Sequence, residues 1–133
     1  MVSIFTKIIN GEIPSTKLHE DEQCIAILDL YPNHKGHALV IPKVEVETML
    51  ECPEDVLQHL IVIAQRVGKK QIDALQCDGF NIIINNKPAA GQEVLHLHIH
   101  VIPRYENDGY VIGFGKKQYV EGEMQEYGKK LSL

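Results

Sequence analysis

Residues 96–101 alternate strictly between histidine and an aliphatic residue, in the order His-Leu-His-Ile-His-Val. Successive side chains of a β-strand point to opposite faces of the sheet, so this period of two predicts a strand over residues 94–102. The three imidazoles would then share one face, which we expect to be solvated, while the aliphatic residues face a core. A chain with this segment must build a sheet with a histidine-bearing face.

Three other segments also read as strands. Apolar and β-branched residues fill 24–30, 37–41 and 80–85. The first two are separated by residues 31–36, where Pro, Asn and Gly predict a turn. Four strands are therefore expected from local pattern alone.

One long helix is expected after Pro53. Acidic residues follow this proline, Lys69 and Lys70 suit a last turn, and the intervening apolar residues form one wide face. A two-turn helix is expected between Ser3 and Gly11. Helix formers also occur over 118–131, where two glycines interrupt them.

Length and charge limit the classes of protein to consider. A chain of 133 residues is expected to form a single domain. Its formal net charge of -5 argues against sequence-independent binding of a nucleic acid polymer, because such binding needs clustered Lys and Arg. A small anionic ligand remains compatible with this charge, since one site needs only local positive potential.

The cysteines and the hydropathy pattern indicate a compartment. Cys24, Cys52 and Cys77 are widely spaced and form no Cys-x-x-Cys pair, so neither a disulfide framework nor a cysteine-based zinc site is suggested. No run approaches the ~20 apolar residues of a membrane span, and the N-terminal segment lacks a signal-peptide pattern. We therefore expect a cytoplasmic protein that binds no membrane.

Two kinds of chemistry suit three imidazoles on one strand face. In one, His-x-His supplies two zinc ligands and a third group completes an open site. In the other, a neutral imidazole attacks phosphorus and its neighbours supply protons and charge. We favour the nucleophile because the cysteines lack ligand spacing and Glu93 is the one acidic residue close in sequence.

The histidine run and its flanks resemble the histidine triad (HIT) superfamily of nucleotide hydrolases and transferases. The run His96-x-His98-x-His100, followed by Val101-Ile102, is similar to the motif that names this family. Further resemblance lies in residues 4–14, Asp29, residues 36–43 and Gly91-Gln92-x-Val94. Pro103-Arg104 resembles the branch with many bacterial HIT proteins and Fhit-like enzymes, rather than the Hint branch.

The resemblance implies an architecture. It is an α+β fold with a five-stranded antiparallel sheet, which a homodimer extends to a sheet of ten strands. Residues 1–133 would form one HIT domain, with a core over 3–105 and a C-terminal tail over 106–133.

The resemblance also implies catalytic roles. His98, the middle histidine, would be the nucleophile that attacks the α-phosphorus of a nucleotide. His96, His100 and the upstream His37 would line the phosphate and the leaving group. Histidine suits these roles because its pKa near 6.5 allows both neutral and cationic forms.

Four further residues are expected to bind the substrate. By resemblance, Asp29 is the ribose-binding acid, Asn85 reaches the phosphate or leaving-group side, and Gln92 lies in the same loop. Glu93 stands where the Hint branch has a serine near the leaving group. From local sequence alone, Asp29 could instead cap the turn after it, and Asn85 could be an ordinary turn residue.

No cofactor and no metal are expected. Some bacterial relatives hold a structural zinc through Cys-x-x-Cys, a further histidine and one triad histidine, but here these places carry Ser3, Thr6 and Glu45. His19, His34 and His59 fall outside the motif, and we expect them, like the acidic residues 20–22, on the surface.

The leading functional hypothesis is a nucleotide hydrolase acting through a covalent His98 intermediate. Its substrate would be an AMP-like purine nucleotide, either an adenosine phosphoramidate or a dinucleoside polyphosphate. Two alternatives stay open. One is a nucleotide-binding interaction module with incidental catalysis, and the other is a metal-dependent enzyme.

Overall fold

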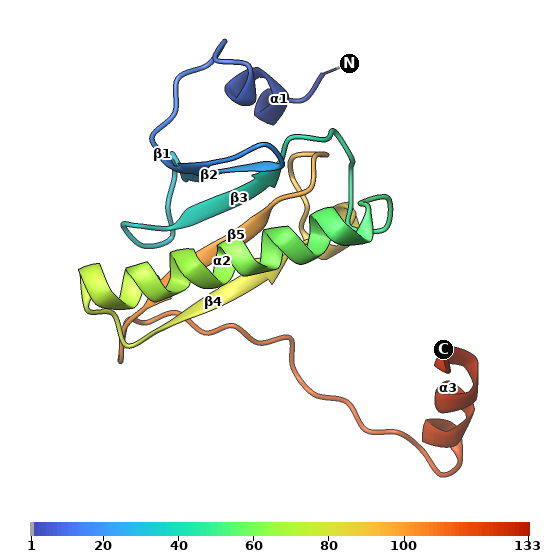
Figure 1. Ribbon diagram of the computed structural model, residues 1–133. Coiled ribbons are helices and arrows are strands. Elements are labelled where there is room, and N and C mark those ends of the chain that lie inside the picture. The colour runs from blue at the N-terminus through green and yellow to red at the C-terminus, as the bar shows by residue number, and fades with distance from the viewer. Residues whose placement is uncertain (1) are drawn as a thin grey trace.

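Five strands form one antiparallel sheet in the computed structural model, which describes residues 2–133 (Figure 1). Their spatial order is β1-β2-β3-β5-β4. The bounds are Lys17–Glu20 for β1, Cys24–Leu28 for β2, Ala38–Pro42 for β3, Gly79–Ile84 for β4 and Ile99–Arg104 for β5. The α+β fold with five antiparallel strands is thereby confirmed.

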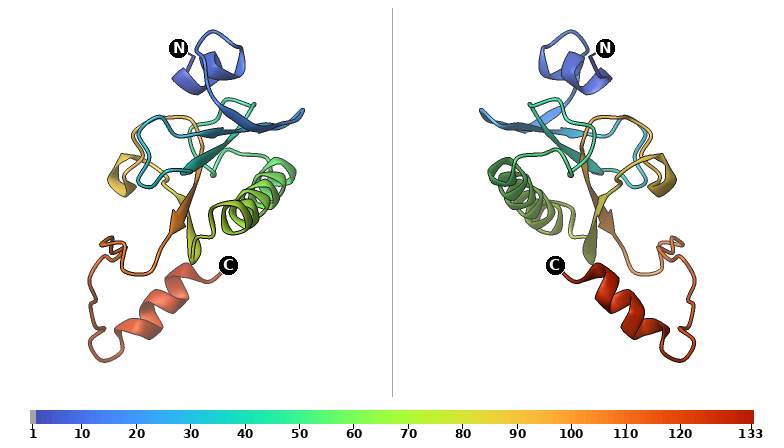
Figure 2. Two further views of the ribbon diagram at one scale, coloured as in Figure 1. Left: turned by 90° about the vertical axis from the view of Figure 1, so that its left-hand side faces the viewer. Right: turned by 90° about the vertical axis from the view of Figure 1, so that its right-hand side faces the viewer.

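Helices lie on and beside this sheet. Their bounds are Ile4–Ile9 for α1, Glu54–Leu75 for α2 and Glu123–Leu131 for α3, with a short 3-10 turn, η1, at Pro88–Ala90. Figure 2 shows α2 along one face of the sheet. Within residues 2–133, none of the helices combines the length and the apolar character needed to cross a membrane.

The main core lies between α2 and the sheet. Leu97, Ile99 and Val101 are fully buried there and pack with helix residues such as Leu60 and Ala64. The prediction that the aliphatic residues of the alternating run face a core is confirmed. Burying apolar side chains of this size stabilises each by about 1.5–3 kcal/mol relative to exposure.

Helix α2 is longer than the residue pattern predicted. It continues past Lys70 to Leu75 and ends where Gln76 adopts a left-handed conformation with φ of 54°. The added turn is held by buried Gln71, whose Nε2 donates to the carbonyls of Gly36 and Val101 at 2.9 Å. These tertiary bonds, which local pattern does not show, extend the helix beyond its two lysines.

The opposite face of the sheet carries a smaller apolar cluster. Buried Phe5 of α1 packs there with Ile25 and Ile27 of β2 and with Leu39 and Ile41 of β3. The predicted N-terminal helix is confirmed. Its N-cap is Ser3, whose side chain accepts a hydrogen bond from the backbone N–H of Thr6.

The strand predicted over residues 94–102 is shorter in the structure, so that prediction was wrong at its N-terminal end. Pairing of β5 with β3 begins at Ile99, which lies opposite Val40. The residues just before Ile99 do not pair with β3 because their backbone groups bond to other partners. The N–H of Leu97 donates to the carbonyl of Val46 at 2.8 Å. The histidine run is therefore part strand and part loop.

Of two peripheral elements, β1 was not expected from local pattern, and α3 lies within the interrupted helix formers of 118–131. Strand β1 is polar and mostly exposed, so it lacks the apolar alternation that identifies a half-buried strand. Helix α3 has no buried residue. Figure 1 shows that the chain after β5 runs away from the sheet and that α3 stands apart from it.

Candidate active site

A cavity of about 1060 Å³ opens on the face of the sheet that carries α1. Its volume is slightly above the usual range for small-molecule sites, about 300–1,000 Å³. The lining includes six of the residues predicted from sequence: Asp29, His37, Asn85, Glu93, His98 and His100. His96 and Gln92 are not among the lining residues.

His98 has a defined tautomer. Its Nδ1 lies 2.7 Å from the carbonyl oxygen of His96, and a carbonyl oxygen can only accept. Nδ1 therefore carries the hydrogen, and Nε2 of the neutral ring keeps its lone pair. The ring is 7% exposed and stands edge-on to Phe5, with centroids 4.9 Å apart. The protein thus holds His98 with an unprotonated nitrogen available to a ligand.

His37 and His100 form a chain of oriented hydrogen bonds. The backbone N–H of Asn33 donates to Nδ1 of His37 at 3.1 Å, so the hydrogen of neutral His37 is on Nε2. That Nε2 donates to Nδ1 of His100 at 3.0 Å. Nδ1 of His100 is thereby an acceptor, and its Nε2–H remains as a donor. The site pairs a lone pair on His98 with an N–H on His100.

Burial keeps these rings neutral. It lowers the pKa of His37 and the pKa of His98 below the usual value. The pKa of His100 falls to about 4, first because of burial and then because His98 and His37 lie nearby. A low-dielectric site disfavours imidazolium, so the nucleophilic form needs no deprotonation at neutral pH.

Asp29 has two roles in the local geometry. Its Oδ1 accepts from the backbone N–H of Tyr31 at 2.9 Å, which is the turn-capping bond considered from sequence. Its Oδ2 lies 3.7 Å from Nε2 of His37. One carboxylate oxygen therefore fixes the turn, and the other stays near the imidazoles.

Gln92 holds the loop before the histidine run and does not reach the cavity. Its side chain is 4% exposed, accepts from the N–H of Lys87, and donates to the carbonyls of Glu47 and Val94. Gly91 precedes it with φ of 94°, which favours glycine. The loop formed in this way carries Glu93 to the cavity.

His96 is fully buried and both of its ring nitrogens are bonded to protein. Nδ1 lies 2.6 Å from the hydroxyl of Ser3, and Nε2 lies 2.9 Å from the carbonyl of Pro42. Because the carbonyl must accept, Nε2 donates and Nδ1 accepts from the serine. The geometry makes His96 a residue that positions the N-terminus against the sheet.

Comparison with known proteins identifies the family. The HIT domain family model matches residues 10–107. The chain belongs to the HIT family. An uncharacterized HIT-like protein of Methanocaldococcus jannaschii is 48% identical over 121 residues, covering 89% of this chain and 91% of that protein. A HIT family crystal structure from Bacillus subtilis superposes with a TM-score of 0.91 at 34% identity, covering 99% and 96% of the two chains.

Several HIT relatives are named for an activity on adenosine nucleotides, as adenosine 5'-monophosphoramidases or as an adenylylsulfatase. The adenosine 5'-monophosphoramidase of Saccharomyces cerevisiae is 42% identical over 112 residues, covering 84% of this chain and 68% of the yeast protein. The resemblance that the sequence motifs indicated is therefore confirmed at the level of the family.

The positions where the resemblance in sequence suggests a structural zinc in some relatives carry a hydrogen-bond network here. Ser3 bonds His96, and the Oγ1 of Thr6 donates to Oε1 of Glu45 at 2.8 Å. The same carboxylate oxygen accepts from the backbone N–H of Ser3. Zinc prefers nitrogen and thiolate ligands, and two hydroxyls with one carboxylate do not fit such a site. We call this network of Ser3, Thr6, Glu45 and His96 the N-terminal latch.

The residues that could hold a metal ion in this cavity differ from the His-x-His pair considered from sequence. The ligand atoms of Asp29, His37 and His100 lie within 4.8 Å of one another, and only one of these is from the triad. The cavity also has an apolar wall that was not expected from sequence, formed by Phe5, Ile8, Ile27 and Leu39 among others. Helical spacing marks Phe5 and Ile8 as apolar, but it does not show that they border a ligand site.

Proposed function

We propose that this HIT protein hydrolyses the 5′-phosphoryl bond of a purine nucleotide, with His98 as the nucleophile. One observation carries the proposal. The hydrogen bond from His98 Nδ1 to the carbonyl of His96 leaves Nε2 unprotonated, with its lone pair available beside a cavity of nucleotide size. The structure thus supplies the unprotonated nitrogen that nucleophilic attack on phosphorus requires.

The substrate class is an adenosine phosphoramidate, in which an amine is joined to the phosphate of AMP. The relation to the yeast adenosine 5'-monophosphoramidase supports this choice. The apolar wall with Phe5 and Ile27 offers a surface for a purine ring. Asp29 would accept hydrogen bonds from the ribose hydroxyls, and Asn85 and Glu93 would lie toward the phosphate and the leaving group.

The reaction would proceed in two displacements. In the first, Nε2 of His98 bonds to phosphorus, the P–N bond breaks, and the amine leaves with its electron pair and takes up a proton from solvent. The Nε2–H of His100 donates to a phosphate oxygen where charge develops. In the second, water bonds to the same phosphorus, the bond to His98 breaks, and AMP leaves while the proton from water passes to solvent.

Turnover measurements test the proposal. Adenosine phosphoramidate and diadenosine polyphosphates are offered to the wild-type protein, to His98→Ala and to His34→Gln, with and without a chelator. His34 is a matched control because it is also a histidine whose ring is hydrogen-bonded, to Asp108 at 3.0 Å, but it does not line the cavity. We expect chelator-resistant phosphoramidate turnover in wild type and His34→Gln and a loss of about 10³-fold or more in His98→Ala.

Other outcomes would redirect the assignment. If diadenosine polyphosphates are turned over faster than adenosine phosphoramidate, the enzyme prefers the leaving group of the dinucleoside polyphosphates. Tight nucleotide binding without turnover would favour the interaction module. Turnover abolished by the chelator would favour a metal-dependent enzyme.

We further infer that two copies associate into a homodimer. The tail over 106–133 exposes apolar side chains, with Val111 91% and Phe114 99% accessible in the single chain. Exposed apolar groups of this kind are typical of surfaces that associate. Light scattering after size exclusion should give twice the chain mass, and a monomeric mass at micromolar concentration would contradict the inference.

A further inference from the structure

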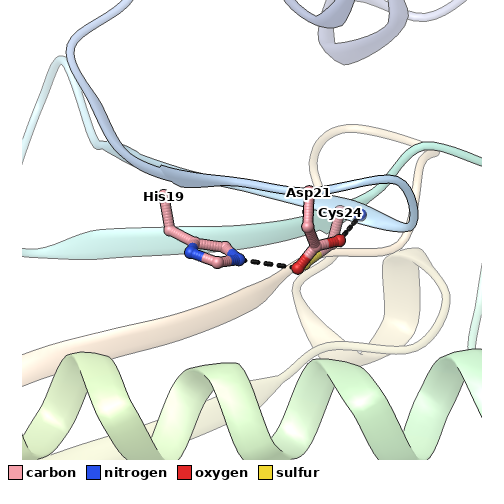
Figure 3. A group of neighbouring side chains, drawn as sticks. All are labelled: His19, Asp21 and Cys24. Atoms are coloured by element: carbon pink, nitrogen blue, oxygen red, sulfur yellow. Dashed lines mark hydrogen bonds and ion pairs between the residues drawn. The ribbon is translucent and has the colours of Figure 1, made fainter.

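A second group of histidines lies outside the cavity. His19 at the end of β1, Asp21 in the β1–β2 turn and His59 on α2 meet at one point, and none of them lines the cavity. Figure 3 shows His19, Asp21 and the neighbouring Cys24. Both histidines were expected separately on the surface, and the fold brings them to one carboxylate.

The contacts converge on a single oxygen atom. Nε2 of His19 lies 2.6 Å and Nε2 of His59 lies 2.7 Å from Oδ2 of Asp21. The thiol sulfur of Cys24 lies 3.6 Å from the same oxygen. Two imidazole nitrogens, a carboxylate oxygen and a sulfur are the donor types that zinc and similar ions prefer.

The backbone fixes the orientation of Asp21. Its other oxygen, Oδ1, accepts from the N–H groups of Gln23 at 2.8 Å and Cys24 at 3.0 Å. Carboxylates that bind metal ions are commonly oriented by hydrogen bonds of this kind. One oxygen is therefore held by the turn, and Oδ2 is directed at the histidines.

We propose that His19 Nε2, Asp21 Oδ2, Cys24 Sγ and His59 Nε2 bind one divalent transition-metal ion of the zinc class. The ligand atoms of His19, Asp21 and Cys24 already lie within 4.8 Å of one another. His59 adds the fourth donor from α2 through its contact with the same Asp21 oxygen.

The distances require a small opening of the cluster. Ligands of a tetrahedral zinc, with bonds of about 2.0 Å to N or O and 2.3 Å to S, lie about 3.3–3.5 Å apart. The sulfur-to-oxygen distance of 3.6 Å already fits this geometry. The two nitrogens lie closer to the oxygen than that. They must move outward by about 0.6–0.7 Å, which side chains 37% and 31% exposed can do.

Cys24 would be the ligand that reports on binding. Burial and the charge of Asp21 raise the pKa of its thiol to about 12, so the free protein carries the protonated thiol. A bound metal ion would displace that proton, because the thiolate is the form that binds. Metal binding would therefore release a proton and join the β1–β2 turn to α2.

The test uses the tag-free, metal-stripped full chain and cobalt(II) as a spectroscopic probe. All variants carry His100→Asn, which removes one ligand of the Asp29, His37 and His100 group. Into this background we place His59→Gln, Cys24→Ser and the matched control His34→Gln. Absorbance follows cobalt binding, and calorimetry follows zinc.

We expect one cobalt ion per chain, with a thiolate-to-cobalt charge-transfer band. His59→Gln should weaken binding by more than about tenfold, His34→Gln should leave it unchanged, and Cys24→Ser should remove the band. Failure of the protein to bind cobalt, or equal affinity in His59→Gln and His34→Gln, would overturn the proposal. If Cys24→Ser does not fold by circular dichroism, the comparison of His59→Gln with His34→Gln still decides.

Discussion

The carbonyl oxygen of His96 and the Nδ1 of His98 lie 2.7 Å apart, so the backbone of one triad histidine sets the tautomer of the next. This relationship requires the chain between them to leave the sheet ladder, as it does before Ile99. If the segment were a regular strand, its carbonyls would instead point along the sheet toward neighbouring strands. The departure from strand geometry is therefore part of how the site is built.

Covalent labelling tests the role of His98. A slowly hydrolysed adenosine phosphoramidate should leave one adenylyl group per chain, because attack by an imidazole nitrogen bonds phosphorus to the ring. Peptide mapping by mass spectrometry should locate it on His98, and His98→Ala should remain unlabelled. An adduct on His100 in the wild-type protein would contradict this assignment.

Asp29 should discriminate between ribose and deoxyribose. Asp29→Ala should weaken binding of AMP by about 1.5–3 kcal/mol, the usual contribution of hydrogen bonds to a charged group, and binding of dAMP by much less. Asp29→Asn is the control, because an amide oxygen can still accept the bond from Tyr31 that caps the turn. Equal losses for AMP and dAMP in Asp29→Ala, with both affinities restored in Asp29→Asn, would assign Asp29 to the turn alone.

Acid should destabilise the protein through its histidines. The folded-state pKa of His100, about 4, lies below the value near 6.5 of the unfolded chain. Between these values the unfolded state binds more protons, so the free energy of unfolding should fall as the pH falls from 6.5 toward 4. Denaturant unfolding at several pH values should show this slope. His100→Asn should reduce it, and an unchanged slope would show that the ring is not held neutral.

The N-terminal latch should contribute measurably to stability. Ser3→Ala removes the cap of α1 and leaves the buried Nδ1 of His96 without its donor. We expect the free energy of unfolding to fall by about 1–3 kcal/mol. Ser3→Thr keeps a hydroxyl and should recover most of the loss. Equal stability of Ser3→Ala and the wild type in urea unfolding would mean that the latch contributes nothing.

Gly68 on α2 should not tolerate a side chain. A Cβ atom at this position would lie 2.5 Å from Cε2 of Phe80, so Gly68→Ala should cost about 1–3 kcal/mol through overpacking despite the better helix propensity of alanine. Gly79→Ala is the control, since a Cβ there meets no atom within 4 Å. Thermal unfolding of the two variants gives the comparison, and equal melting temperatures would contradict the expected clash.

The core and the histidine-bearing face could be predicted because they depend on local periodicity. The alternation around Ile99 identifies a strand and its buried side, and the apolar stripe around Leu60 identifies α2. Strand β1 has no such stripe, and its pairing of Lys17 with Ile27 is set by β2 rather than by its own residues. A polar edge strand therefore gave no local signal.

The position of His96 could not be predicted because its partners are distant in sequence. Ser3 and Pro42, which bond its two nitrogens, are 93 and 54 residues away. The alternating sequence predicted one environment for the three triad histidines. In the structure His98 and His100 line the cavity, whereas His96 is buried in the interior. The meeting of His19 and His59 at Asp21 is equally a product of tertiary folding.

The latch has a consequence for how the protein responds to oxidants and to zinc supply. Peroxide converts thiolate ligands to sulfenic acids, which would release a zinc ion held by a Cys-x-x-Cys pair. Ser3, Thr6 and Glu45 offer no sulfur to oxidise and need no ion to assemble. The attachment of α1, and with it the placement of Phe5 against His98, should therefore persist under oxidative stress and zinc starvation alike.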